Sequence, residues 1–95
     1  MAEDKKPKRM PVKINDEVLK GVYSNSLMVL HTRNEFVIDF ATMFPPHGSV
    51  NARVIVRPES IKRMVKALQE NIDKYEARFG EIPLPAPSEE YPEFS

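Results

Sequence analysis

His31 and Asp39 are the side chains in this sequence best suited to acid–base chemistry. They fall in two neighbouring stretches that favour β-structure, where an aspartate could orient a histidine as a general base. No serine, cysteine or lysine is placed beside them as a nucleophile. A strand histidine with one hydrogen bond is a commoner arrangement, and His47, in a Pro-Pro-His-Gly turn, is expected to be exposed. The sequence therefore predicts no catalytic residue and a protein that is not an enzyme.

The sequence also lacks a recognisable set of ligands for a metal ion or a cofactor. It contains no cysteine, which excludes disulfides and thiolate metal sites. Its two histidines lie far apart without acidic residues at ligand spacing. The three glycines, Gly21, Gly48 and Gly80, are too scattered to form a glycine-rich phosphate loop. We therefore expect no metal, no cofactor and no small-molecule substrate.

Positive charge is the remaining feature that could bind a ligand. Arg53 and Arg57 alternate along one stretch, where they could form an anion-binding face with Lys62 or Arg63 at a helix start. The plainer interpretation is a cross-strand ion pair between Asp39 and a neighbouring arginine. The cations of the N-terminal arm could also contact phosphates. The candidate contacts for an anion or a nucleic acid are Lys5, Lys6, Lys8, Arg9, Arg53 and Arg57.

Charge and proline content divide the chain into three parts. Residues 1–13 are expected to form a basic flexible tail, residues 14–80 a single α+β domain, and residues 81–95 a proline-rich acidic flexible tail. The chain as a whole has 14 basic and 14 acidic residues. Because dedicated nucleic-acid-binding domains usually carry a basic excess, this balance argues against the whole domain being a dedicated nucleic-acid binder. The basic arm could instead be a solvated tail, or fold back on the acidic tail of a neighbouring subunit.

The central domain contains three stretches with the composition of β-strands. Residues 23–32 and 35–44 are rich in β-favouring side chains and flank a tight turn at Arg33 and Asn34. In the second stretch Phe36, Ile38 and Phe40 should share one face because strand side chains alternate. A loop over residues 45–49 is expected to precede a third strand over residues 51–57. The sequence therefore predicts a three-stranded antiparallel β-meander.

The clearest element is an amphipathic helix from Pro58 to Phe79. Proline suits the first helical position, and Gly80 stands where a helix ends. Such a helix is about 33 Å long, so it either matches its own strands or extends beyond the sheet. The apolar residues repeat at spacings of 4, 3, 4, 3 and 4: Ile61, Val65, Leu68, Ile72, Tyr75 and Phe79. This stripe either covers its own sheet or packs on another chain.

Self-association is the expected means of stabilising so small a domain. A domain of this size buries only about 60% of its unfolded surface and is marginal alone. With disulfides and metals excluded, oligomerisation remains, and a homodimer is the favoured form. The candidate self-association residues are Leu68, Ile72, Tyr75 and Phe79. The sequence has no membrane-spanning stretch and no signal peptide, so we expect a soluble cytoplasmic protein.

Several segments resemble one small prokaryotic family, the domain-of-unknown-function family 3467. The resemblance covers about residues 12–82. Its most characteristic pieces are Gly21-Val22-Tyr23-Ser24-Asn25, Glu35-Phe36-Val37-Ile38-Asp39-Phe40, Arg57-Pro58-Glu59 and Asn71-Ile72-Asp73-Lys74-Tyr75-Glu76. The resemblance implies that the chain shares the fold of this family and comes from a bacterium. It implies no activity, substrate or catalytic residue.

The function favoured by these observations is a non-catalytic, homo-oligomeric binding or scaffolding module that engages another, unidentified protein. One alternative is a nucleic-acid-binding protein that uses the basic arm and the strand arginines. A second alternative is a chaperone of SecB type that holds unfolded chains, since that family is similar in topology. The similarity concerns only the arrangement of strands and helix, so it does not establish function.

Overall fold

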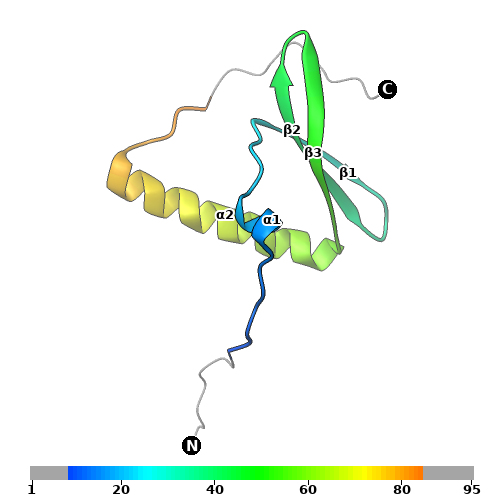
Figure 1. The fold of residues 1–95 in the computed structure, drawn as a ribbon. Helices are drawn as coiled ribbons and strands as arrows, with labels where there is room; N and C mark the ends of the chain where they lie inside the picture. Colours follow the sequence, from blue (N-terminus) through cyan, green and yellow to red (C-terminus); the bar gives the residue numbers. More distant parts are fainter. Residues whose placement is uncertain (1–8, 85–95) are drawn as a thin grey trace, which may run out of the picture.

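The computed structural model describes residues 9–84 of the chain (Figure 1). A short helix comes first, three strands follow, and a long helix ends the described part. The elements are α1 (Asp16–Leu19), β1 (Ser26–His31), β2 (Phe36–Phe44), β3 (His47–Val56) and α2 (Pro58–Phe79). This order confirms the predicted α+β fold. Residues 1–8 and 85–95 lie outside the described part, as do the predictions made for them.

The three strands form an antiparallel sheet in the order β1-β2-β3, so the predicted meander is confirmed. Phe36, at the start of β2, lies opposite His31 of β1 and Val56 of β3. Between β1 and β2, the backbone N–H of Thr32 donates to the carbonyl of Glu35 at 2.9 Å. The chain therefore reverses at Arg33 and Asn34, and the predicted tight turn is confirmed.

The prediction of a loop over residues 45–49 is wrong. β2 continues to Phe44, only Pro45 and Pro46 form the turn, and β3 begins at His47, directly opposite Phe44. Proline has no backbone N–H and so cannot donate to a strand ladder. Pro45 and Pro46 occupy the turn, where no such donor is needed. The residues that follow have their N–H groups and resume pairing at once.

A bulge in β3 connects the sheet to the segment before β1. Phe40 lies opposite Ala52 and Ala41 opposite Val50, so Asn51 is an extra residue in β3. Its side-chain amide donates to the carbonyl of Tyr23 at 2.9 Å. The bulge therefore turns a β3 side chain toward a segment that lies beyond the sheet.

Two further side chains attach this segment to β2. The amide of Asn25 accepts the backbone N–H of Met43 at 2.8 Å and donates to its carbonyl at 3.1 Å. The hydroxyl of Ser24 donates to the carbonyl of Ala41 at 3.0 Å. The backbone N–H of Asn25 also donates to the carbonyl of Ala41 at 3.0 Å. Side-chain contacts therefore supplement backbone pairing before β1 begins at Ser26, although strand-like composition begins at residue 23.

Very little of the described chain is buried. Ile38 and Ala41 are the only buried apolar residues in residues 9–84, and Asp39 between them is also buried. No residue of α2 is buried, although Ile61 and Met64 near its start are half-buried. Of the two alternatives left open for the stripe, the structure does not show the one in which it covers its own sheet. After the corner at Pro58, α2 runs beneath the meander and away from it (Figure 1).

Replacing Asn25 with alanine tests the side-chain attachment. Each lost hydrogen bond contributes about 0.5–1.5 kcal/mol, so the free energy of unfolding should fall by about 1–2 kcal/mol. Urea denaturation followed by circular dichroism measures this change. Asn34→Ala is the matched control, since Asn34 uses only its backbone N–H in the turn. An unchanged midpoint for Asn25→Ala would mean that backbone contacts alone hold the segment.

Candidate interaction surface

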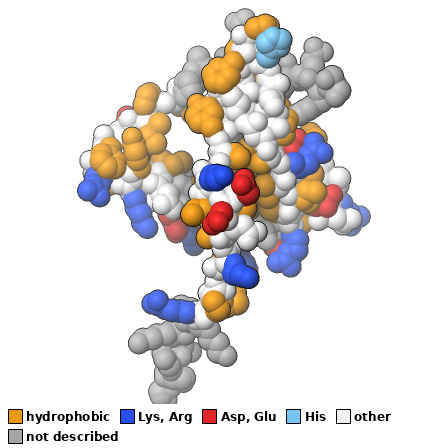
Figure 2. All heavy atoms as spheres, viewed as in Figure 1, with side chains coloured by type: hydrophobic (Ala, Val, Ile, Leu, Met, Phe, Trp, Pro, Cys, Tyr) orange, Lys and Arg blue, Asp and Glu red, His pale blue; other side chains and the backbone are white. Residues whose placement is uncertain are grey.

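The four residues predicted for self-association all lie exposed on α2. Leu68 and Phe79 are each 65% exposed, Tyr75 is 50% exposed and Ile72 is 40% exposed. The rings of Tyr75 and Phe79 contact each other with centroids 5.0 Å apart. The space-filling view shows hydrophobic side chains gathered over the C-terminal end of α2 (Figure 2). We call this set, together with Ile61 and Val65, the α2 stripe.

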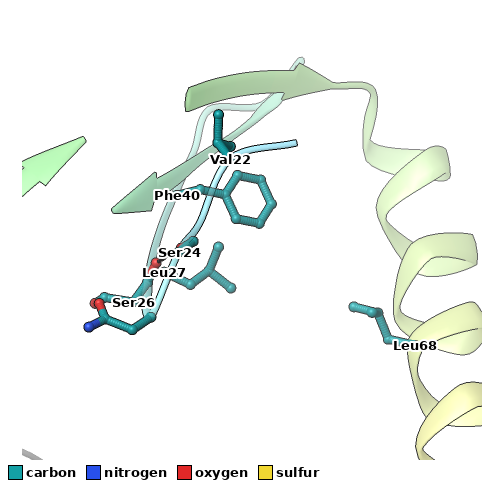
Figure 3. A pocket seen from close by; sticks show the side chains of 7 residues that line it. Val22, Ser24, Ser26, Leu27, Phe40 and Leu68 are labelled. Carbon is teal, nitrogen blue, oxygen red and sulfur yellow. Dashed lines mark hydrogen bonds between the residues drawn. The ribbon is translucent and has the colours of Figure 1, made fainter. Parts of the chain in front are cut away.

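An apolar groove separates the N-terminal half of the meander from α2. Val22, Leu27 and Phe40 line it on the sheet side, and Leu68 points into it from the helix (Figure 3). Its polar lining consists of Ser24, Asn25 and Ser26. The groove is wide and open to solvent, with a volume of about 650 Å³. Its apolar side chains are therefore accessible from solvent.

The sheet face toward the groove is mostly apolar. Phe36, Ile38 and Phe40 share this face, as their alternation predicts, and their cross-strand neighbours extend it. Of those neighbours, Val29 is 49% exposed and Val54 is 39% exposed. Phe40 is only half-buried because α2 does not close over it.

The opposite face of the sheet carries a cross-strand ion pair. Asp39 lies directly opposite Arg53. The Nε and Nη2 atoms of Arg53 donate to the two carboxylate oxygens of Asp39 at 2.7 and 2.8 Å. The carboxylate is buried, whereas the arginine side chain is 57% exposed. The hydrogen bond from Arg53 holds the pKa of Asp39 below its ordinary value, and the carboxylate raises the pKa of Arg53. The predicted ion pair is confirmed.

This pair changes the set of cations that could bind an anion. Arg53 is already engaged by a buried carboxylate, while Arg57 is exposed four residues further along, about 13 Å away along an extended chain. Arg9 is exposed at the N-terminal end of the described part. Lys5, Lys6 and Lys8 lie outside the described residues. Within the described part, therefore, the candidate cations do not converge on one site.

The two side chains suited to acid–base chemistry lie on opposite faces of the sheet. His31 is opposite Phe36, and their ring centroids are 5.5 Å apart. Asp39 instead points to the other face, where it binds Arg53. Residues 9–84 contain no group of three side chains that could hold a metal ion. No helix in the described part is long and apolar enough to cross a membrane.

Val22 and Leu27 are surface residues that sequence reasoning did not single out. Leu27 shares its face with Phe40, and the alternation of β1 could have indicated this. Val22 has no such signal, because it lies before the first strand and reaches the groove only through the side-chain attachment described above.

Replacing Asp39 with asparagine tests the ion pair through its pH dependence. Because the folded protein lowers the pKa of Asp39 from about 3.8, the pair should stabilise fully above that value. That contribution should disappear as the pH falls through the lower pKa of the folded state. We expect Asp39→Asn to be less stable at pH 7 and to lose this acid-dependent part of its stability.

Urea midpoints measured from pH 7 to pH 2 give the comparison. The exposed Asp16 supplies the control, since Asp16→Asn removes the same charge without breaking a buried contact. If the difference between the original chain and Asp39→Asn stayed constant across this range, the pair would not be the acid-sensitive contact.

Comparison with known proteins identifies one family. A model of the family described as Protein of unknown function (DUF3467) matches residues 1–84, which includes the meander, the groove and the α2 stripe. Neither the curated proteins nor the solved structures include a match to this chain. The chain therefore belongs to the DUF3467 family.

Proposed function

We propose that this protein is a small, non-catalytic binding module that works as a homo-oligomer through protein–protein contacts in the cytoplasm. The exposed α2 stripe is the observation that carries this proposal. An apolar stripe on a helix usually faces a core, and this one faces solvent along most of its length. A second protein surface would remove that apolar area from water.

The small core supports the same proposal. Fully burying one large aliphatic or aromatic side chain contributes about 1.5–3 kcal/mol, whereas ordering each residue costs about 1–2 kcal/mol. Ile38 and Ala41, the buried apolar residues of the described part, cannot offset that cost alone. Covering the groove and the α2 stripe would supply the missing hydrophobic stabilisation. Association and folding are therefore expected to be coupled.

The polar side chains that line the groove favour binding over catalysis. Ser24 and Asn25 both direct their side chains to backbone groups of β2, so they hold the segment in place. Neither the hydroxyl nor the amide has a histidine or carboxylate as a hydrogen-bond partner in residues 9–84. A nucleophile needs such a base beside it. The groove is thus better suited to hold an apolar surface than to act on a substrate.

The open groove also favours a second candidate, a chaperone-like holder of unfolded chains. Its apolar walls and polar rim suit an extended apolar segment. This candidate requires that the groove stay open in the assembled oligomer. Suppression of aggregation by the full chain, measured on a reduced and unfolded test protein, would support it.

Changing Leu68 and Ile72 to aspartate tests the proposal. Two charges in an apolar interface should abolish association, because burying unpaired carboxylates is very costly. We expect the mass in solution to fall to the 10.9 kDa monomer, together with partial or complete loss of structure. Sedimentation equilibrium and circular dichroism measure both changes.

The control places the same charges elsewhere on α2. Ala67 and Ala77 lie off the stripe, so Ala67→Asp with Ala77→Asp should leave the mass of the oligomer unchanged. The proposal fails if the original chain is monomeric and folded at all concentrations. It fails equally if the Leu68 and Ile72 variant keeps the original mass and fold.

A further inference from the structure

We infer that the α2 stripe binds the α2 stripe of a second copy of this chain, with the two helices antiparallel and centred near residue 70. This inference rests on the proposed self-association and specifies its partner, direction and register. The observations behind it are the exposure of the stripe, the order of its apolar residues and the charges on its two flanks.

The stripe has the heptad order of a helix that pairs with another helix. Apolar side chains recur every 3.5 residues from Ile61 to Phe79, the period at which two helices stay in contact. Antiparallel pairing about residue 70 matches every apolar position with an apolar position of the second copy. The matched pairs are Ile61 with Phe79, Val65 with Tyr75, and Leu68 with Ile72.

The first flank of the stripe carries complementary charges at its two ends. This flank consists of Lys62, Gln69 and Glu76, spaced by seven residues. In an antiparallel pair each flank faces the same flank of the second copy. Lys62 then lies beside Glu76 of the second copy, and the two-fold symmetry repeats this pair. Gln69 lies beside its own copy near the symmetry axis.

A parallel pair lacks this complementarity. There the first flank would face the second flank, which consists of Met64, Asn71 and Arg78 and is extended by Arg57 just before the helix. Lys62 would approach Arg57 of the second copy, so two like charges would meet at the helix start. Glu76 would face Asn71 and gain no cation. Charge therefore selects the antiparallel direction.

The distribution of charge along the whole helix points the same way. The first half of α2 and its preceding residue carry an excess of cations, whereas the second half carries more acids than bases. The cations of the first half are Arg57, Lys62, Arg63 and Lys66, and the acids of the second half are Glu70, Asp73 and Glu76. Cations at a helix N-terminus oppose the helix dipole. Antiparallel docking places the acidic half of the second helix along this basic half, with Lys62 next to the interface and Arg63 on the outer side of the helix.

Both charged partners are available in the single chain. Lys62 is exposed and has no ion-pair partner within residues 9–84. Glu76 uses one carboxylate oxygen to accept the backbone N–H of Ile82 at 2.8 Å, which fixes its position at the end of the helix. Its other oxygen can accept from a lysine. Leu68 projects into the open groove, so a second helix can reach it (Figure 3).

Charge reversal on the first flank tests this arrangement. In the full chain, Lys62→Glu places two carboxylates together twice per dimer, and Glu76→Lys does the same with two ammonium groups. Each change should raise the dimer Kd about tenfold, because two attractive pairs per dimer become repulsive. The double variant restores the pairs in reverse and should return to within about threefold of the original Kd. Sedimentation across a dilution series measures these constants.

Arg63→Glu is the matched control, because it makes the same charge change on the side of α2 that faces away from the stripe. It should leave the Kd within about twofold of the original value. Loss of the Glu76 contact to Ile82 cannot account for rescue, since both the Glu76→Lys and double variants lose it. Additive weakening in the double variant would overturn the inference, as would unchanged Kd values in both single variants.

Crosslinking gives an independent test of direction, because the chain has no native cysteine. Gln69→Cys should form a covalent dimer with a short bis-maleimide reagent, since the two residues lie beside the symmetry axis. Lys62→Cys should not, because antiparallel docking separates the two copies of residue 62 by about 24 Å. In any parallel pair the two variants would behave alike, since each residue would face its own copy at the same height.

The outcomes separate this inference from the proposed function. A dimer that crosslinks equally through both cysteines, or through neither, refutes antiparallel docking but keeps homo-oligomerisation. A chain that is monomeric at every concentration refutes both. Selective crosslinking of Gln69→Cys together with charge rescue supports the complete inference.

Discussion

The described fold depends on the burial of one strand, β2. All three buried residues of residues 9–84, namely Ile38, Asp39 and Ala41, lie on it. It is the central strand, so both of its edges are hydrogen-bonded, and the segment before β1 is attached to it by side chains. A carboxylate in this position is tolerated because Arg53 satisfies both of its oxygens from the neighbouring strand. The remaining elements extend outward from this strand.

Such an arrangement separates what holds the sheet together from what the sheet exposes. Hydrogen bonds and one ion pair define the register of the meander, yet hydrogen bonds contribute little net free energy. Hydrophobic burial normally supplies the larger part. In this chain the apolar groups that could supply it, in the groove and on α2, are exposed in the single copy. The single copy therefore leaves most of its large apolar side chains exposed to solvent.

The sequence predicted the elements that depend on local chemistry. Alternation in residues 36–40, the turn at Arg33 and Asn34, and the start of α2 at Pro58 all follow from side-chain periodicity or backbone restrictions. It failed where distant residues decide the outcome. The bulge at Asn51 and the attachment of Asn25 depend on contacts across the sheet. The direction of α2 after Pro58 depends on tertiary packing, which periodicity alone does not specify.

The bulge at Asn51 also affects how the protein avoids aggregation. A three-stranded open sheet leaves one edge of β1 and one edge of β3 unpaired, and such edges can template indefinite strand-to-strand polymerisation. An extra residue bends and twists its strand and interrupts the regular row of N–H and C=O groups. The longest exposed edge of this sheet is thus irregular at its middle. The irregularity disfavours indefinite growth through the strand edges, while the apolar side chains of the groove and of α2 stay accessible.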